Sequence, residues 1–243
     1  MTRFFVSPQE MVSNFFVLTG ENAAHAKVLR LRQGEEVLVC DGEGKECLCC
    51  ISDISSDIVS LVVKDRREST SEPNVLVRVY LAFPKADKLE HVIQKATELG
   101  AYEIVAFPSA RCVSRPDEKS IKKKLERWQK IAASAAEQSG RGYVPKVRVL
   151  GSFKEAIQDA SNADMPVLFY ENERSTTLHM ALSSCAFHTI SLLTGPEGGL
   201  EPREVEMAAE LGIRICTLGR RILRCETAPL CALSAVMYHS GEF

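Results

Sequence analysis

The 243-residue chain lacks the features of a membrane-spanning or exported protein. It contains no apolar run that approaches the roughly 18 residues needed to cross a bilayer. Residues 1–10 include no extended apolar segment, so we expect no signal peptide and a cytoplasmic location. Hydrophobic residues make up 45% of the chain and charged residues 26%, a balance that is ordinary for a soluble folded protein.

The chain also lacks the cysteine and histidine spacing of a zinc site. Its nine cysteines are an odd number, scattered from Cys40 to Cys231, and a disulfide framework is not expected in a chain of this length without an export signal. The densest cluster is Cys47-Leu48-Cys49-Cys50, but no second cysteine or histidine pair follows it at zinc-ligand spacing. The cluster falls within a strand-like run, so we interpret these residues as small buried hydrophobes and expect no metal.

Two well-known nucleotide-binding patterns are absent as well. No glycine loop is followed by the Lys-Ser/Thr of a Walker motif, and the G-x-G-x-x-G dinucleotide fingerprint does not occur. These absences argue against a P-loop enzyme and against a nicotinamide-dependent oxidoreductase. What the chain has instead is two other glycine-punctuated stretches, residues 193–200 (LTGPEGGL) and residues 218–229 (LGRRILRCETAP).

Each glycine stretch follows an apolar run that is typical of a buried strand and precedes a helical pattern. Two such loops at the carboxyl edge of one sheet form a place for a polar small molecule. The first loop leads into an acidic helix start at 201–204, which complements the helix dipole and argues against phosphate binding there. The second holds Arg220, Arg221 and Arg224, and clustered arginines commonly face an anion or a partner. Pairing of one of them with Glu226 is the structural alternative.

The net charge of −2 conceals an uneven distribution. Residues 111–148 hold 11 Lys and Arg but only 4 Asp and Glu, in a chain that is otherwise acidic. This block indicates either a localised surface for a polyanion such as RNA or a solvated helix face. Charge alone leaves both interpretations open.

The pattern of apolar residues changes near residue 73. Before it, short strands at 35–40, 46–51 and 58–63 and one helix at 21–29 indicate a small β-rich module, and the polar residues 68–74 resemble a linker. After it, strands and helices alternate, which predicts a parallel sheet covered on both faces. We therefore expect an α/β protein with domains at 1–72 and 73–243. The strands of the second domain are expected at 75–83, 104–107, 147–150, 167–170, 190–193 and 213–218, and its helices at 87–99, 120–139, 152–160, 176–183, 201–211 and 228–238.

The two glycine stretches resemble those of the SPOUT methyltransferases, and more closely the ribosomal RNA small subunit methyltransferase E (RsmE) family. The resemblance is carried by Gly195 to Gly199, by Leu218-Gly219 and by Ile222 to Ala228, with Pro229 as a departure. Further matches follow in the family's order and cover nearly the whole chain: His25 to Arg30, Asp41-Gly42, Lys95 to Gly100, Arg111-Cys112, Arg127 to Ile131 and Ala136 to Arg141.

This resemblance implies a PUA-like RNA-binding β-barrel over 1–72 and a SPOUT methyltransferase domain over 73–243 with a C-terminal trefoil knot. It also implies a homodimer that uses S-adenosylmethionine to methylate N3 of a uridine in small-subunit (16S) ribosomal RNA, free or within the 30S particle. Two alternatives remain: a non-catalytic RNA-binding module, and a SPOUT methyltransferase that acts on another RNA.

The resemblance further implies roles for individual residues. Arg224 is the expected catalytic residue, because a guanidinium can stabilise the negative charge that develops on the base. Glu197 is expected to accept a hydrogen bond from the cofactor or to accept the N3 proton, and the structural alternative is a turn carboxylate that caps backbone amides. The cofactor-binding residues implied are Thr194, Gly195, Pro196, Glu197, Gly198, Gly199, Leu218, Gly219, Ile222, Leu223, Arg224, Thr227 and Ala228. The loop after Leu168 to Glu171 is expected to form a third wall of the same site. The RNA-binding residues implied are Arg30, Arg111, Lys122, Lys123, Lys124, Gln138 and Arg141.

Overall fold

The computed structural model describes residues 1–113 and 116–243, which form two compact units. The first unit comprises residues 1–72 and 136–144, and the second comprises residues 73–135 and 145–243. A boundary thus falls after Glu72, where the sequence analysis places one. The short segment 136–144 is nevertheless grouped with the N-terminal residues, although it lies far from them in the sequence.

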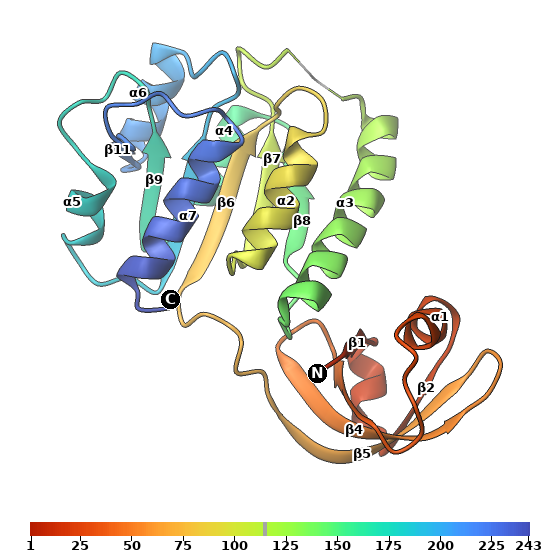
Figure 1. The fold of residues 1–243 in the computed structure, drawn as a ribbon. Coiled ribbons are helices and arrows are strands. Elements are labelled where there is room, and N and C mark those ends of the chain that lie inside the picture. Colours follow the sequence, from red (N-terminus) through yellow and green to blue (C-terminus); the bar gives the residue numbers. More distant parts are fainter. Residues whose placement is uncertain (114–115) are drawn as a thin grey trace. The chain divides into compact units, whose positions relative to one another are not determined.

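The first unit is built on a five-stranded sheet in the order β1-β3-β4-β5-β2 (Figure 1). Strand β1 pairs parallel with β3, and the other neighbours are antiparallel. Cys47 and Cys49 are buried in its core, which confirms their interpretation as small hydrophobes. Strands β1 and β2 were not predicted, because each is only three or four residues long. The elements are β1 (Arg3–Phe5), η1 (Pro8–Val12), β2 (Phe15–Leu18), α1 (Gly20–Val28), β3 (Glu36–Cys40), β4 (Lys45–Ile54) and β5 (Val59–Glu68).

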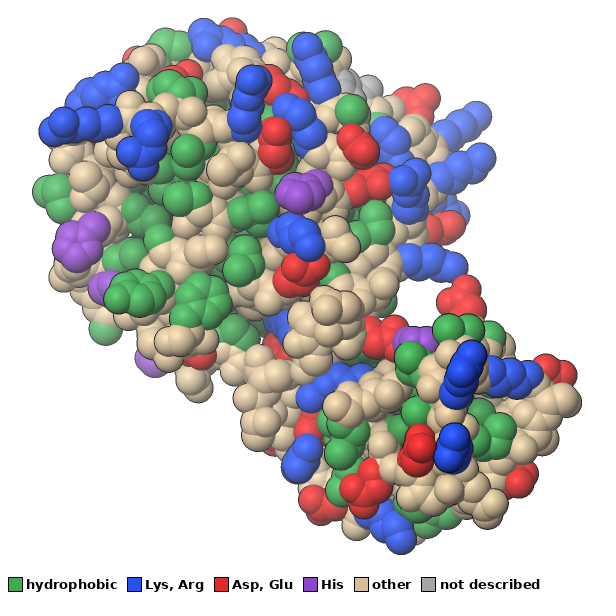
Figure 2. Space-filling view, viewed as in Figure 1, with side chains coloured by type: hydrophobic (Ala, Val, Ile, Leu, Met, Phe, Trp, Pro, Cys, Tyr) green, Lys and Arg blue, Asp and Glu red, His purple; other side chains and the backbone are tan. Residues whose placement is uncertain are grey.

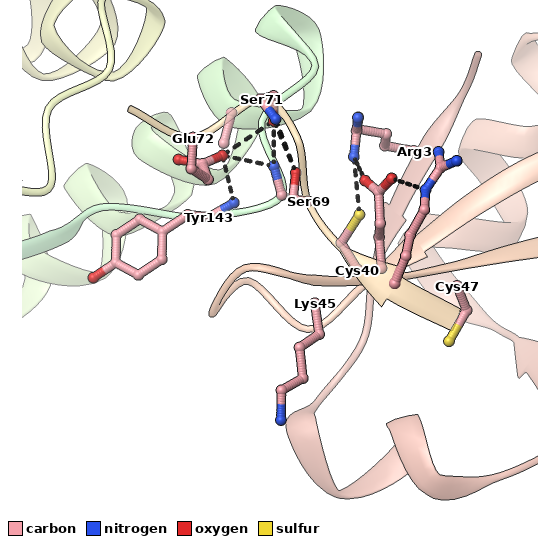
Figure 3. Close-up of polar contacts among 12 residues, drawn as sticks. Arg3, Cys40, Lys45, Cys47, Ser69, Ser71, Glu72 and Tyr143 are labelled. Atoms are coloured by element: carbon pink, nitrogen blue, oxygen red, sulfur yellow. Dashed lines mark hydrogen bonds and ion pairs between the residues drawn. The ribbon is translucent and has the colours of Figure 1, made fainter. Parts of the chain in front are cut away.

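Two carboxylates organise the polar interior of the first unit (Figure 3). The side chain of Glu46 is 1% exposed and is paired with both Arg3 and Arg67. Burial alone would raise the pKa of Glu46, but its hydrogen bonds to the two guanidinium groups produce a net lowering. Glu72 accepts hydrogen bonds from the backbone amides of Gly142 and Tyr143, at 2.9 and 3.2 Å, and so holds segment 136–144 within this unit.

The second unit is built on a six-stranded parallel sheet in the order β11-β9-β10-β6-β7-β8 (Figure 1). Helices α2 and α7 cover one face, and α4 and α6 cover the other. The α/β class with a parallel sheet is therefore confirmed. The strands are β6 (Leu76–Ala82), β7 (Glu103–Phe107), β8 (Lys146–Val149), β9 (Met165–Phe169), β10 (Thr189–Thr194) and β11 (Arg214–Cys216). The helices are α2 (Lys88–Glu98), α3 (Glu118–Ser139), α4 (Phe153–Ala160), α5 (Leu178–Leu182), α6 (Pro202–Glu210) and α7 (Thr227–His239).

The parallel direction of the strands decides where the polar loops meet. Strands β9, β10 and β11 are neighbours and end at the same edge of the sheet. Strands β9 and β10 are largely apolar and buried, so most of the polar side chains near this edge come from the loops that follow the strands. Among the helices of the described residues, none is both long enough and apolar enough to cross a bilayer.

Candidate active site

A pocket of about 510 Å³ opens at the edge where β9, β10 and β11 end. Its walls come from the three loops that follow these strands, so the structure brings both glycine stretches into one site. Every residue that the sequence analysis assigned to cofactor binding lines the pocket except Thr227, which begins α7 beside it. The volume is within the range of roughly 300–1,000 Å³ that is common for small-molecule sites.

The first loop, residues 194–200, requires its glycines. Gly199 has a φ of +69°, in the left-handed region that favours glycine, and a Cβ there would lie 2.3 Å from Oε1 of Glu171. A Cβ on Gly195 would lie 3.0 Å from the side chain of Leu200. The amide of Gly199 donates to the carbonyl of Pro196 at 2.9 Å and closes the turn. Side chains at these glycines would therefore push the loop out of its position in the pocket wall.

The helix that follows the first loop is capped by its own carboxylates. Glu201 and Glu204 form a capping box at the start of α6. The Glu204 side chain also accepts a hydrogen bond from the amide of Ala110 at 2.8 Å, which ties the loop to the segment after β7. Because these acids occupy the positive end of the helix, the structure agrees with the expectation that no phosphate binds there.

Glu197 is held in place by α2 and the turn before it. Its Oε1 lies 3.0 Å from Nζ of Lys88 and accepts a hydrogen bond of 3.0 Å from the amide of Lys85. Burial would raise the pKa of Glu197, but these donors lower it to about 2. A carboxylate that holds its charge so firmly is a poor proton acceptor. The contacts therefore correct the interpretation of Glu197 as the base and favour its role as a cap.

The second loop, residues 218–228, presents unpaired arginines. Arg220, Arg221 and Arg224 are exposed, and none of their guanidinium groups makes a hydrogen bond or ion pair with another residue that the structure describes. Glu226, the expected alternative partner, instead lies 3.1 Å from Nζ of Lys88. Arg221 and Arg224 line the pocket, whereas Arg220 does not.

The residues predicted to bind RNA differ in their surroundings. Lys122 and Lys123 are exposed on α3 and Lys124 is half-buried, and basic side chains project from this helix in Figure 2. Arg111 donates to the carbonyl of Gly198 at 3.2 Å, so it lies against the first loop. Gln138 is exposed at the end of α3. These positions leave their side chains at the surface, where a polyanion could reach them.

Arg30 occupies an unusual backbone position. It follows α1 with a φ of +55°, and the amides of Arg30 and Leu31 donate to the carbonyls of Lys27 and Ala26. This is a Schellman ending, in which glycine is the usual residue at the position of Arg30. The side chain of Arg30 is exposed, so it is open to contact with RNA.

Arg141 is the one predicted RNA contact that the structure places elsewhere. It is only 4% exposed, and its Nη2 and Nε lie 2.7 and 3.1 Å from the Glu72 carboxylate. Its guanidinium also lies over the ring of Tyr143. The interpretation of Arg141 as an RNA contact is therefore corrected: the residue is buried and paired within the first unit.

Phe169, at the end of β9, and Tyr170 and Glu171, in the loop after it, line the pocket as the third wall that the resemblance implies. Arg221 and Cys225 lie within the second loop, and Thr217, just after β11, is the pocket residue that the sequence analysis missed. Thr217 joins the site because β11 lies beside β9, and no local sequence signal reveals that strand order. Burial raises the pKa of Cys225 to about 12, so its thiol stays protonated and donates to Glu226 at 3.2 Å. In the described part of the chain, no group of three or more His, Cys, Asp or Glu side chains could hold a metal.

Comparison with known proteins identifies relatives of both units. An RNA methyltransferase domain model matches residues 71–237, and an RNA methyltransferase PUA domain model matches residues 18–64. Ribosomal RNA small subunit methyltransferase E of Bacillus subtilis is 39% identical, over 99% of this chain and 97% of the relative.

Solved structures of methyltransferases also match nearly the whole chain. The enzyme of that name from Neisseria gonorrhoeae, solved with S-adenosylmethionine, is 30% identical with a TM-score of 0.87 over 98% of this chain and 97% of the other. A methyltransferase of Legionella pneumophila, also solved with S-adenosylmethionine, is 26% identical with a TM-score of 0.83 over 98% and 97%.

Proposed function

This chain belongs to the ribosomal RNA small subunit methyltransferase E family, and on that premise we propose that it transfers a methyl group from S-adenosylmethionine to N3 of a uridine in small-subunit ribosomal RNA. The observation that carries the proposal is the shared pocket. The two glycine loops, 24 residues apart from Gly195 to Gly219, form opposite parts of one cavity at the sheet edge. A protein that only bound RNA would have no use for such a pocket.

The residues around the pocket fit S-adenosylmethionine. The glycines of the first loop let its backbone pack tightly against Leu200, Arg111 and Glu171, so backbone rather than side chains forms this part of the wall. The wall combines apolar side chains, including Leu218, Ile222 and Leu223, with the carboxylate of Glu171. Glu171 has no hydrogen bond or ion pair with other described residues, so it is available to polar or positively charged groups of the cofactor.

The chemistry requires orientation and charge stabilisation. S-adenosylmethionine, when bound, supplies a methyl group on an electrophilic sulfonium, so the protein need not activate the donor. Loss of the N3 proton spreads negative charge onto the uracil carbonyl oxygens. Arg224 lines the pocket and has no ion pair with another described residue, which supports a role in stabilising that charge. Holding donor and base together contributes further, since orientation can be worth about 7–11 kcal/mol.

We propose that each unit contributes its own RNA-contacting residues: Arg30 and Gln138 in the first unit, and Arg111, Lys122, Lys123 and Lys124 in the second. Arg111 donates a hydrogen bond to the carbonyl of Gly198 and so lies against the first loop of the pocket. The lysines of α3 supply sequence-independent attraction to phosphates. With ribosomal RNA as substrate, the protein would act in the cytoplasm, either on free RNA or on the assembled small subunit.

We also propose that the protein is a homodimer. Helix α7 is apolar over most of its length, and its inner face packs on α2, β6 and β10. The opposite face retains exposed or half-buried Leu230, Cys231, Ala235 and Tyr238, with Tyr238 77% exposed. Small and apolar side chains at spacings of three and four residues suit a second helix. Size-exclusion chromatography with light scattering would test this proposal. The wild type should elute as a dimer and Ala235→Arg as a monomer.

Titration of the full-length protein with S-adenosylmethionine in a calorimeter, followed by mass spectrometry of nucleosides from treated ribosomal RNA, tests the main proposal. We expect saturable binding and the appearance of 3-methyluridine. Naked RNA and assembled small subunits from cells without the gene should be compared as substrates. Cofactor binding without any methylated nucleoside from either substrate would contradict the proposed acceptor, and absence of binding would contradict the methyltransferase itself.

A further inference from the structure

Lys88, at the first position of α2, contacts both glycine loops. Its Nζ lies 3.0 Å from Oε1 of Glu197 in the first loop and 3.1 Å from Oε2 of Glu226 in the second. The loops approach each other around the pocket, and this ammonium group is paired with a carboxylate from each of them. Lys88 itself does not line the pocket, so it does not belong to the cofactor-binding surface.

The turn before α2 is shaped to make these contacts. Ala86 has a φ of +56°, a region that residues with a Cβ adopt at a cost in free energy. This turn places the amide of Lys85 on Glu197 and, three residues later, the ammonium of Lys88 on the same carboxylate. Backbone strain and two charge-assisted contacts thus coincide at one point beside the loops.

The groups that surround Lys88 support a permanent ion pair. Hydrogen bonds with Glu197 and Glu226 raise the pKa of Lys88, and the same contacts contribute to the lowered pKa values of both carboxylates. Cys225 lies 3.7 Å from Nζ, but its thiol is protonated and donates to Glu226, so it adds no competing charge. The side chain of Lys88 is 28% exposed, which leaves the pairs partly shielded from solvent.

We propose that Lys88 is a positioning residue that fastens the two cofactor loops to each other before the cofactor binds. It would fix the width of the pocket and so reduce the ordering that binding must otherwise impose. The inference rests on the proposed function, because its benefit is realised when S-adenosylmethionine enters the pocket. The ion pairs of Lys88 are already present in the free protein, so their effect on the exchange rates of the loops can be measured without the cofactor.

The test compares Lys88→Met, Lys88→Arg and the matched control Lys85→Met in the full-length protein. Lys85→Met removes the same charge three residues away, and the Lys85 side chain has no ion pair among the described residues. Hydrogen–deuterium exchange of the free protein should rise in residues 194–200 and 218–228 of Lys88→Met and nowhere else. The Kd for S-adenosylmethionine should weaken by about tenfold, as expected for two partly exposed ion pairs. Lys88→Arg should restore both readouts, and Lys85→Met should match the wild type.

Unchanged exchange in both loops of Lys88→Met would overturn the inference. So would faster exchange spread evenly over the second unit together with a lower Tm, because that pattern indicates a general role in stability. If Lys88→Met does not fold, Glu226→Gln removes one of the two carboxylates and should still raise exchange in the second loop. Failure of the wild type to bind S-adenosylmethionine would contradict the proposed function, whereas the exchange data would still decide whether Lys88 fastens the loops.

Discussion

The two loops that form the pocket hold their charges in opposite ways. In the first loop, the charged Glu197 is satisfied inside the protein by Lys88 and by the amide of Lys85. In the second loop, Arg220, Arg221 and Arg224 have no such partner among the residues that the structure describes. A charge that is paired internally fixes the shape of a loop, whereas an unpaired one is free to meet a ligand. This difference supports the proposal that Arg224 meets the substrate, while both loops line the cofactor pocket.

The largest expected effect is in the second loop. Arg224→Ala should lower the rate of methyl transfer by about 100-fold or more, the usual cost of removing a donor that stabilises developing negative charge. The Kd for S-adenosylmethionine should change little, because the glycine backbone remains. Single-turnover assays and calorimetry separate the two quantities. Arg220→Ala is the matched control, since it removes the same charge outside the pocket, and equal rates for the two variants would remove Arg224 from the chemistry.

The next largest effect concerns the three consecutive lysines on α3, Lys122, Lys123 and Lys124. Reversal of Lys122, Lys123 and Lys124 to glutamate should weaken RNA binding by more than about tenfold and lower the slope of log affinity against log salt by about 2, if three phosphate contacts are lost. Filter binding at several salt concentrations measures both. Lys154→Glu, on α4, serves as a control. An unchanged slope would mean that the α3 lysines are a solvated face.

A smaller effect is expected from the shape of the first loop. Gly199→Ala should weaken S-adenosylmethionine binding by about tenfold, because the new Cβ meets Glu171 and the φ of +69° disfavours alanine. Gly212→Ala separates these causes: its φ is +78°, but nothing lies within 4 Å of its Cβ position. This control should lose about 1 kcal/mol of stability and bind the cofactor normally. Equal S-adenosylmethionine binding by the two variants would show that close contact between residue 199 and Glu171 does not affect cofactor binding.

The smallest effect is a pH dependence of the first loop. The pKa of Glu197 is lowered to about 2 in the folded protein, from an ordinary value of 4.5. Its contacts therefore stabilise the fold above the ordinary pKa, and the stabilisation is lost as the pH falls from about 4.5 towards 2. The difference in Tm between the wild type and Glu197→Gln should be constant from about pH 8 to pH 5 and shrink below pH 4. A difference that already varied near neutral pH would contradict the tight pairing of Glu197.

The sequence predicted the second unit better than the first. Long apolar runs alternating with amphipathic helices were sufficient to place every strand of the parallel sheet within a few residues. In the first unit, strands β1 and β2 were missed because three or four residues carry too little periodicity. For the pocket, the glycine stretches indicated two walls and the family resemblance indicated the third, at Phe169 to Glu171. The residues themselves carry no pattern for the third wall, because its place depends on the order of the strands. The trefoil knot stays a prediction.

By itself, the sequence determined the α/β class and the two glycine loops, because the spacing of apolar residues and the positions of glycines are local properties of the chain. It also directed attention to Arg224. Only the tertiary structure decided which charges are paired: Glu197 with Lys88, Arg141 with Glu72, and the arginines of the second loop with no partner among the described residues. Pairing depends on distances of about 3 Å between residues as many as 138 positions apart, as for Lys88 and Glu226, and no local pattern specifies such distances.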